Sequence, residues 1–145
     1  MMPQDTSAEE SALLLLPLLS RFLAPEYARQ LHLTKTQLLI VTALSYRGSL
    51  NMSQIASYLA FSKEQATRAV APLAEAGLVE RFEQPENRTK VFLRLSPAGT
   101  QLADDLRAQF SSQLRARAQG ALTEQELLQL RESAETLTRL LSKLS

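Results

Sequence analysis

The residues best suited to chemistry lie on one face of a predicted helix in the middle of the 145-residue chain. Ala66, Val70 and Leu73 recur at helical spacing and are expected to form the buried side of that helix. The outward side then carries Lys63, Glu64, Thr67, Arg68 and Ala71. Arg68 has a planar guanidinium fork that can pair with guanine O6 and N7, and Thr67 can contact a phosphate or a thymine methyl group. These residue types on one exposed face favour contact with double-stranded DNA.

Several neighbouring polar residues are also candidates for DNA contact, and most have a structural alternative. Glu64 can accept a hydrogen bond from a cytosine amine, but an acid in the first helical turn is equally explained by the helix dipole. Lys63 can contact a phosphate or remain a solvated lysine. Ser53 and Gln54 begin the preceding helix and can donate to phosphates, whereas Gln54 can equally serve as a capping residue. Ser62, the expected N-cap of the second helix, completes this set of candidates.

The elements that must position these side chains are two short helices separated by a three-residue turn. Asn51 and Ser62 each precede a helix, and each has a glutamine three positions later, which is the spacing of a capping box. Gly77 ends the second helix, because glycine enters the left-handed conformation without steric cost. Residues 51–78 are therefore expected to form a helix-turn-helix.

A β-hairpin is expected directly after the helix-turn-helix. Residues 78–83 and 91–96 are rich in strand-forming side chains, and the polar segment 84–90 between them contains Pro and Asn. The two faces of the second strand are expected to carry Val91, Leu93 and Leu95 on one side and Phe92 and Arg94 on the other. Ser96 and Pro97 then fit the N-cap and first position of a long helix.

Another helix is expected before the helix-turn-helix. Thr34 and Gln37 have the spacing of a capping box at its start, and Gly48 fits its end. The apolar side of this helix is expected to comprise Leu38, Leu39, Val41, Ala43 and Leu44.

Both ends of the chain carry more leucine than one small monomer can readily bury. Residues 8–30 are apolar around most of a helical circumference, and Thr123 with Glu126 opens a final helix. That final helix has a continuous apolar edge of Leu127, Leu130, Ala134, Leu137, Leu141 and Leu144. Together the two ends predict a two-fold dimer interface. The alternative is that these leucines complete the core of the monomer.

The composition excludes several classes of function. The chain has no Cys and a single His, so disulfides, thiolate metal sites and a histidine metal cluster are excluded, and we expect no cofactor. Hydroxyl residues have no histidine base beside them in sequence, and there is no glycine-rich phosphate loop, so an enzyme is not expected. Residues 47–94 hold seven bases and five acids, a mild positive excess in a chain with a net charge of +1. The N-terminus lacks the basic lead of a signal peptide and the leucine run is too short to span a membrane, so a cytoplasmic location is expected.

The order of these elements resembles the multiple antibiotic resistance regulator (MarR) family of bacterial transcription factors. The resemblance rests on LTKTQ, on QIASYL followed by ATRAVAPLAEAGLVER, and on LRLSPAG after the hairpin. Thr67-Arg68, Leu73, the run from Gly77 to Arg81, Leu95-Ser96 and Gly99 match the family pattern jointly.

The resemblance implies a mainly α (α+β winged helix) fold, in which a helix-turn-helix with a β-hairpin wing is flanked by dimerisation helices. Residues 1–145 would form one domain, with 34–96 as the DNA-binding region and 8–33 and 100–145 as dimerisation helices. It also implies a homodimer on a pseudo-palindromic DNA operator, with a recognition helix in each major groove. Such a protein would be a repressor that a small aromatic or anionic effector releases, and the resemblance places Arg21 and His32 near the effector.

Two departures from the family pattern concern the DNA-contacting parts. The family wing typically reads Asp-x-Arg, whereas this chain has Asn87-Arg88-Thr89; a shift by one residue would give Glu86-Asn87-Arg88. In either register we expect Arg88 to reach the minor groove with Lys90 assisting. Pro72 lies inside the recognition helix and removes one backbone donor, so a kink between Arg68 and Pro72 is expected.

These departures, with the near-neutral charge, leave a second interpretation open. The chain can also be a winged-helix adaptor that dimerises and binds a protein partner after losing specific affinity for DNA.

Overall fold

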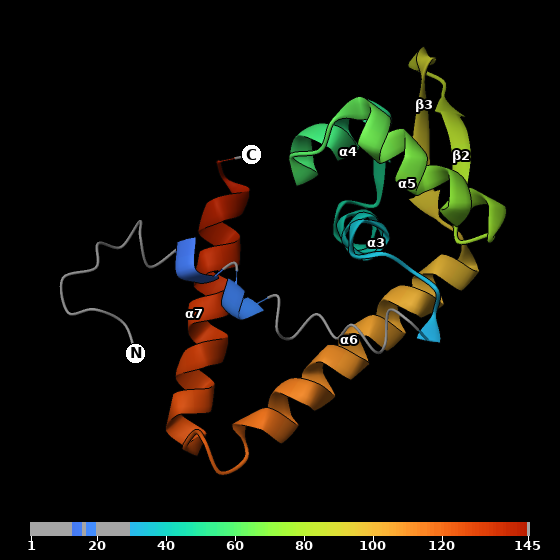
Figure 1. Ribbon diagram of the computed structural model, residues 1–145. Coiled ribbons are helices and arrows are strands. Elements are labelled where there is room, and N and C mark those ends of the chain that lie inside the picture. The colour runs from blue at the N-terminus through green and yellow to red at the C-terminus, as the bar shows by residue number, and fades with distance from the viewer. Residues whose placement is uncertain (1–12, 16, 20–29, 145) are drawn as a thin grey trace.

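The computed structural model describes residues 13–15, 17–19 and 30–144 (Figure 1). Residues 13–15 and 17–19 are helical, and most of the predicted N-terminal helix, including Arg21, lies outside the described residues. The remaining elements are α3 (Lys35–Arg47), β1 (Ser49–Asn51), α4 (Met52–Leu59), α5 (Lys63–Glu75), β2 (Val79–Gln84), β3 (Asn87–Leu95), α6 (Pro97–Ala118) and α7 (Glu124–Ser142). Among the described helices, none is both long and apolar enough to cross a membrane.

The helix-turn-helix is confirmed as α4 and α5, and both predicted capping boxes are formed. The Asn51 amide donates to Gln54 Oε1 at 2.9 Å, and the Gln54 amide donates to Asn51 Oδ1 at 2.8 Å. In α5 the same reciprocal pair joins Ser62 and Gln65, at 3.4 and 3.1 Å. Thr34 caps α3 through Gln37 in the same way. Each of these helices therefore begins where its own sequence satisfies two otherwise unpaired amides.

The end of α5 is fixed by Gly77, as predicted. Gly77 has a φ of 73°, and its amide donates to the Ala74 carbonyl at 3.1 Å. The Leu78 amide donates to the Leu73 carbonyl at 2.9 Å, which completes a Schellman motif. The chain thus leaves the helix in a defined direction. Because α5 continues as one helix through Pro72, the proline does not divide it, and the bend expected before it stays a prediction.

The core lies where α3, α4, α5 and β3 meet, and its fully buried large side chains are Ile40, Leu44, Ile55, Leu73, Leu93, Val41 and Val70. One expectation for α3 was wrong. Leu39 is 37% exposed, whereas Ile40, absent from the expected apolar side, is fully buried. The buried positions 37, 38, 40, 41, 43 and 44 follow the helical repeat, and position 39 falls on the opposite side of the helix.

The sheet has three antiparallel strands in the order β1-β3-β2, and β1 was not predicted. The expected hairpin forms, but its turn is shorter than the polar segment 84–90. Gln84 pairs with Asn87, so that Pro85 and Glu86 alone make the loop. The next pair is Glu83 with Val91, which leaves Arg88, Thr89 and Lys90 looped out of the ladder with β2. The wing therefore carries a bulge of three residues on its second strand.

The expected alternation along β3 is formed, because Phe92 and Arg94 both lie on the side of Phe82. Val91 is 49% exposed, whereas Phe92 is only 8% exposed. Phe92 stacks on its cross-strand partner Phe82 with ring centroids 5.9 Å apart, and the Arg94 guanidinium lies 4.6 Å from the Phe82 centroid. Arg94 also forms an ion pair with Glu80 at 3.1 Å. An aromatic pair covered by an arginine thus buries Phe92.

The start of α6 is tied to the end of α5. The Ser96 hydroxyl donates to the Gly77 carbonyl, and the Ser96 amide donates to the Leu78 carbonyl at 3.0 Å. The Gly99 amide in turn donates to Ser96 Oγ at 3.0 Å. A Cβ atom on Gly99 would lie 2.0 Å from the Leu78 carbonyl oxygen, so only glycine permits this approach. Close packing at this point sets the direction in which α6 leaves the wing.

α6 joins the winged-helix part to α7. Leu102 and Ala103 are buried in the same cluster as α3 and α5, and farther along α6 side chains become exposed. Figure 1 shows α6 leading away from the core to the turn before α7. α7 begins with the predicted Thr123 and Glu126 capping box but contains no buried residue. The alternative that its leucines complete the monomer core is therefore wrong for this helix.

Replacing Gly99 with alanine is expected to destabilise the protein by about 1–3 kcal/mol, because the new methyl group would overlap the Leu78 backbone. Thr100→Ala, at the exposed neighbouring position, is the matched control and should change stability by less than about 0.5 kcal/mol. Urea unfolding at one fixed protein concentration measures both. Equal stability of the two variants would contradict the close approach.

Candidate nucleic-acid interface

The outward side of α5 presents the side chains that its sequence pattern predicted. Ala66, Val70 and Leu73 are fully buried. Lys63, Glu64, Thr67 and Arg68 are exposed, and the helical repeat places them together on the first two turns. A single exposed surface therefore carries a cation, an acid, a hydroxyl and a guanidinium.

Two of these side chains are steadied by their own helix. Thr67 Oγ1 donates to the Lys63 carbonyl at 2.8 Å, and Arg68 Nε makes a long contact of 3.5 Å with the Glu64 carbonyl. The terminal nitrogens of Arg68 stay available for a ligand. Among the described residues neither Lys63 nor Glu64 forms a side-chain hydrogen bond or ion pair, so both head groups face solvent. The arrangement leaves a guanidinium fork and an ammonium group open to an acceptor-rich surface.

The starts of α4 and α5 combine capping with free donors. Ser53 is exposed in the first turn of α4. Gln54 Oε1 accepts the Asn51 amide, which leaves its own amide group able to donate. Ser62 Oγ accepts the Gln65 amide, and its hydroxyl proton remains available. The two roles considered for Gln54 are therefore compatible with each other.

The wing presents Arg88 and Lys90, both exposed, on the bulge of β3. The acid and arginine pair considered for a shifted register is not formed, since the described residues contain no ion pair between Glu86 and Arg88. Instead, Thr89 Oγ1 donates to Asn87 Oδ1 at 2.8 Å. The wing therefore has a hydrogen bond between residues 87 and 89, the positions of the acid and the arginine in the family wing, but both partners are neutral.

The residues named for effector binding are not brought together among the described positions. His32 is exposed in the turn before α3, with a φ of 55°, and Arg21 lies outside the described residues. The structure shows instead a hollow of about 420 Å³ along the first turns of α7, lined by Glu124, Gln125, Leu127, Leu128 and Arg131.

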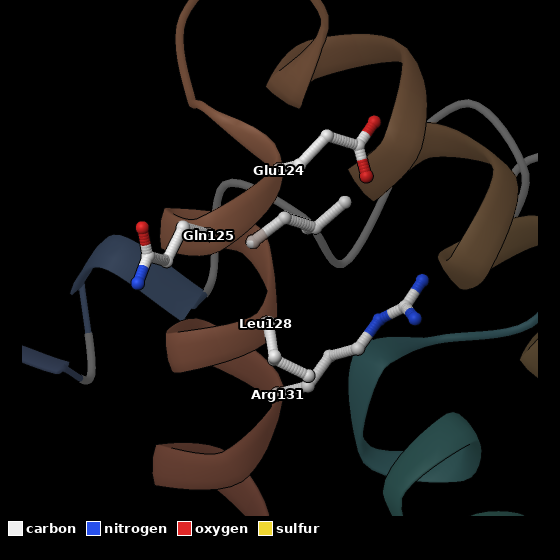
Figure 2. A pocket seen from close by; sticks show the side chains of 5 residues that line it. Glu124, Gln125, Leu128 and Arg131 are labelled. Carbon is white, nitrogen blue, oxygen red and sulfur yellow. The ribbon is translucent and has the colours of Figure 1, made fainter.

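The hollow on α7 was not predicted from the sequence. In Figure 2 the side chains of Glu124 and Arg131 extend to the same side of α7, whereas Gln125 extends to the other. Glu124 and Arg131 are seven residues apart, which is two helical turns, and leucines lie between them. This spacing is the sequence pattern from which the hollow could have been predicted. A cation beside apolar side chains is a combination that can hold a small aromatic acid.

The fold and the exposed helix face define a winged helix-turn-helix protein. The sequence model of the MarR family matches residues 33–91. An uncharacterised HTH-type transcriptional regulator of Bacillus subtilis (strain 168), YhjH, is 28% identical over 82 residues. That stretch covers 57% of this chain and 47% of the relative, so the match spans about half of the relative's length.

Solved structures share the fold over almost the whole chain. Wild-type MarR from E. coli in its apo form superimposes with a TM-score of 0.77 at 18% identity, covering 93% of this chain and 98% of that one. The structure of NadR in complex with 4-hydroxyphenylacetate gives a TM-score of 0.68 at 21% identity, covering 94% and 96%.

Residues 33–91, which hold the helix-turn-helix and most of the wing, match the MarR family of transcriptional regulators. The predicted fold class, a helix-turn-helix with a β-hairpin wing, is confirmed. The alternative of a protein-binding adaptor gains no support from these comparisons, because the matching proteins are described as regulators of transcription.

Proposed function

We propose that this chain is a homodimeric repressor that binds a pseudo-palindromic DNA operator and leaves it when a small-molecule effector binds. The observation that carries the proposal is the exposed face of α5, where Lys63, Thr67 and Arg68 stand outward over a fully buried aliphatic side. Such a helix can enter the major groove, which is about 12 Å wide, with its first two turns against the base edges.

Each candidate residue has a distinct role in this proposal. Arg68 pairs with guanine through its two terminal nitrogens, and Glu64 accepts from a cytosine amine or supports the helix dipole. Lys63, Thr67 and the donors at the two helix starts contact phosphates; those donors are Ser53, Gln54 and Ser62. Arg88 and Lys90 extend the contact onto the DNA beside the major groove.

Two copies are needed because one recognition helix reads only one half-site. The exposed leucines of α7 supply an apolar surface for the partner copy, and none of them is buried in the monomer. We place the DNA-binding region at 34–96 and the dimerisation helices at 8–33 and 100–145. In this arrangement the first turns of α6 pack on the winged helix, and the rest of the helix leads to the dimer interface.

The effector in this proposal is a small aromatic or anionic molecule. NadR, which shares the fold, has been crystallised with 4-hydroxyphenylacetate. The hollow on α7 offers Arg131 to a carboxylate and leucine side chains to a ring. Arg21 and His32 remain candidate effector contacts because the resemblance implies them.

Arg68→Ala is expected to cost about 1–3 kcal/mol of operator binding and to relax the preference at one base pair, because a bidentate contact to guanine is lost. Lys63→Ala should weaken binding to all sequences to a similar extent, since a phosphate contact carries no sequence information. Selection of bound DNA from a random pool, followed by titrations at one salt concentration, measures both. A wild-type chain that selects no sequence would favour the adaptor alternative.

Leu137→Lys combined with Leu141→Lys is expected to convert the dimer to a monomer, because two charges would enter an apolar interface. Thr138→Lys, an exposed polar position on the same helix, is the control and should stay dimeric. Sedimentation at micromolar concentration gives the mass. A wild-type chain that is monomeric there, or a double variant as dimeric as the control, would contradict this interface.

4-Hydroxyphenylacetate is expected to bind the protein in calorimetric titrations and to lower its affinity for operator DNA. Arg131→Ala should weaken ligand binding about tenfold or more, because a charge-assisted hydrogen bond is lost. Arg21→Ala and His32→Ala are titrated in parallel. Gln125→Ala is the control, because this side chain extends to the other side of α7 from Arg131. If neither this acid nor salicylate gives a binding heat, the effector part of the proposal fails.

A further inference from the structure

A hydrogen bond in the wing shows which two side chains lie close together at the bulge. Thr89 Oγ1 reaches Asn87 Oδ1 at 2.8 Å, so these two side chains lie on the same side of β3. Arg88 and Lys90, the two exposed cations of this stretch, take no part in that bond.

The register of the hairpin keeps these two cations unneutralised. Asn87 pairs with Gln84 and Val91 with Glu83, so the residues between them have no partner across the ladder. Arg88 and Lys90 are exposed, and within the described part of the chain neither takes part in an ion pair. The wing thus holds two unpaired positive charges two residues apart in the chain, on the stretch that is looped out of the ladder.

The outermost part of the wing carries the opposite charge. Pro85 and Glu86 form the loop, and Glu86 is exposed with no cation paired to it among the described residues. The minor groove is only about 6 Å wide, and its negative potential is strongest where it is narrowest. Inserting this loop would bring a carboxylate into that potential, while Arg88 and Lys90 lie behind the loop.

We propose, on the basis of the proposed DNA-binding function, that the wing holds the operator by phosphate contacts from Arg88 and Lys90 and reads no base pairs in the minor groove. The bond between Asn87 and Thr89 joins neutral partners and leaves both cations unpaired. This assigns to Arg88 a backbone contact in place of the minor-groove role implied by the resemblance. Sequence preference is then confined to the face of α5.

Salt dependence of operator binding tests the phosphate contacts. For a dimer, Arg88→Ala and Lys90→Ala should each lower the slope of log affinity against log salt by about 1.8, since two contacts worth about 0.9 each are lost. The double variant should lower it by about 3.6. Arg115→Ala removes the same charge from α6, outside the winged-helix region, and should leave the slope unchanged. Unchanged slopes for the wing variants would overturn the proposal.

Operators with altered flanks test the minor groove. The base pairs beside each half-site are made A·T, inosine·C or G·C, since only G·C places an amine in the minor groove. The wild-type protein should bind all three within about twofold, because phosphate contacts carry no sequence information. A loss of about tenfold with G·C that inosine·C restores would show minor-groove reading and overturn the proposal.

A variant that carries Asn87→Asp and Thr89→Arg together restores the acid and arginine pair of the family wing, and it should discriminate against G·C flanks where the wild type does not. Equal discrimination by this variant and the wild type would overturn the assigned role of the Asn87–Thr89 bond. A wild-type protein that binds no operator at all is a different result, because it refutes the proposed function itself.

Discussion

The burial of one side of α5 is the constraint on which the rest of the molecule depends. Ala66, Val70 and Leu73 have no exposed surface, and burial of a side chain such as Val or Leu contributes about 1.5–3 kcal/mol. Turning the helix by one residue, about 100°, would expose Leu73 and push charged groups into the core. The identity of the outward face is therefore set by packing, without any contribution from DNA. Ala66 and Ala69 are small, which lets α5 lie close to the helices beneath it.

The first turns of α6 connect the buried side of α5 to the rest of the chain. Ser96 and Gly99 fix its first turn on the end of α5, and Leu102 fixes the next turn in the core. Arg107 contacts α3, where it bonds to the Ser45 hydroxyl and lies 5.9 Å from the Tyr46 ring. These polar contacts are exposed and individually weak. The buried part of the connection is thus the first half of α6, which packs on the winged-helix core.

What could be predicted from the sequence was local, and what was missed depended on distant partners. The capping boxes at Thr34, Asn51 and Ser62 were predictable because both partners lie within four residues. β1 is three residues long and exists only through its pairing with β3, some forty residues later, so no local pattern marks it. The bulge in β3 was not predicted for the same reason, since register is a property of two strands. The outward face of α5 could be predicted, whereas the hollow on α7 required the positions of several side chains in space.

A net charge of +1 is small for a protein that is proposed to bind DNA, but several positive charges lie close together on its surface. The positive ends of α4 and α5, each equivalent to about half an elementary charge, coincide with the donors at their capped first turns. Lys63 and Arg68 add full charges on the same surface, and Arg88 and Lys90 add two more on the wing. The only acid on the exposed side of the first turns of α5 is Glu64, which the helix dipole itself stabilises. Attraction to DNA in such a molecule depends on the positions of a few charges, because electrostatic interactions between exposed charges are largely screened beyond about 8–10 Å at physiological salt.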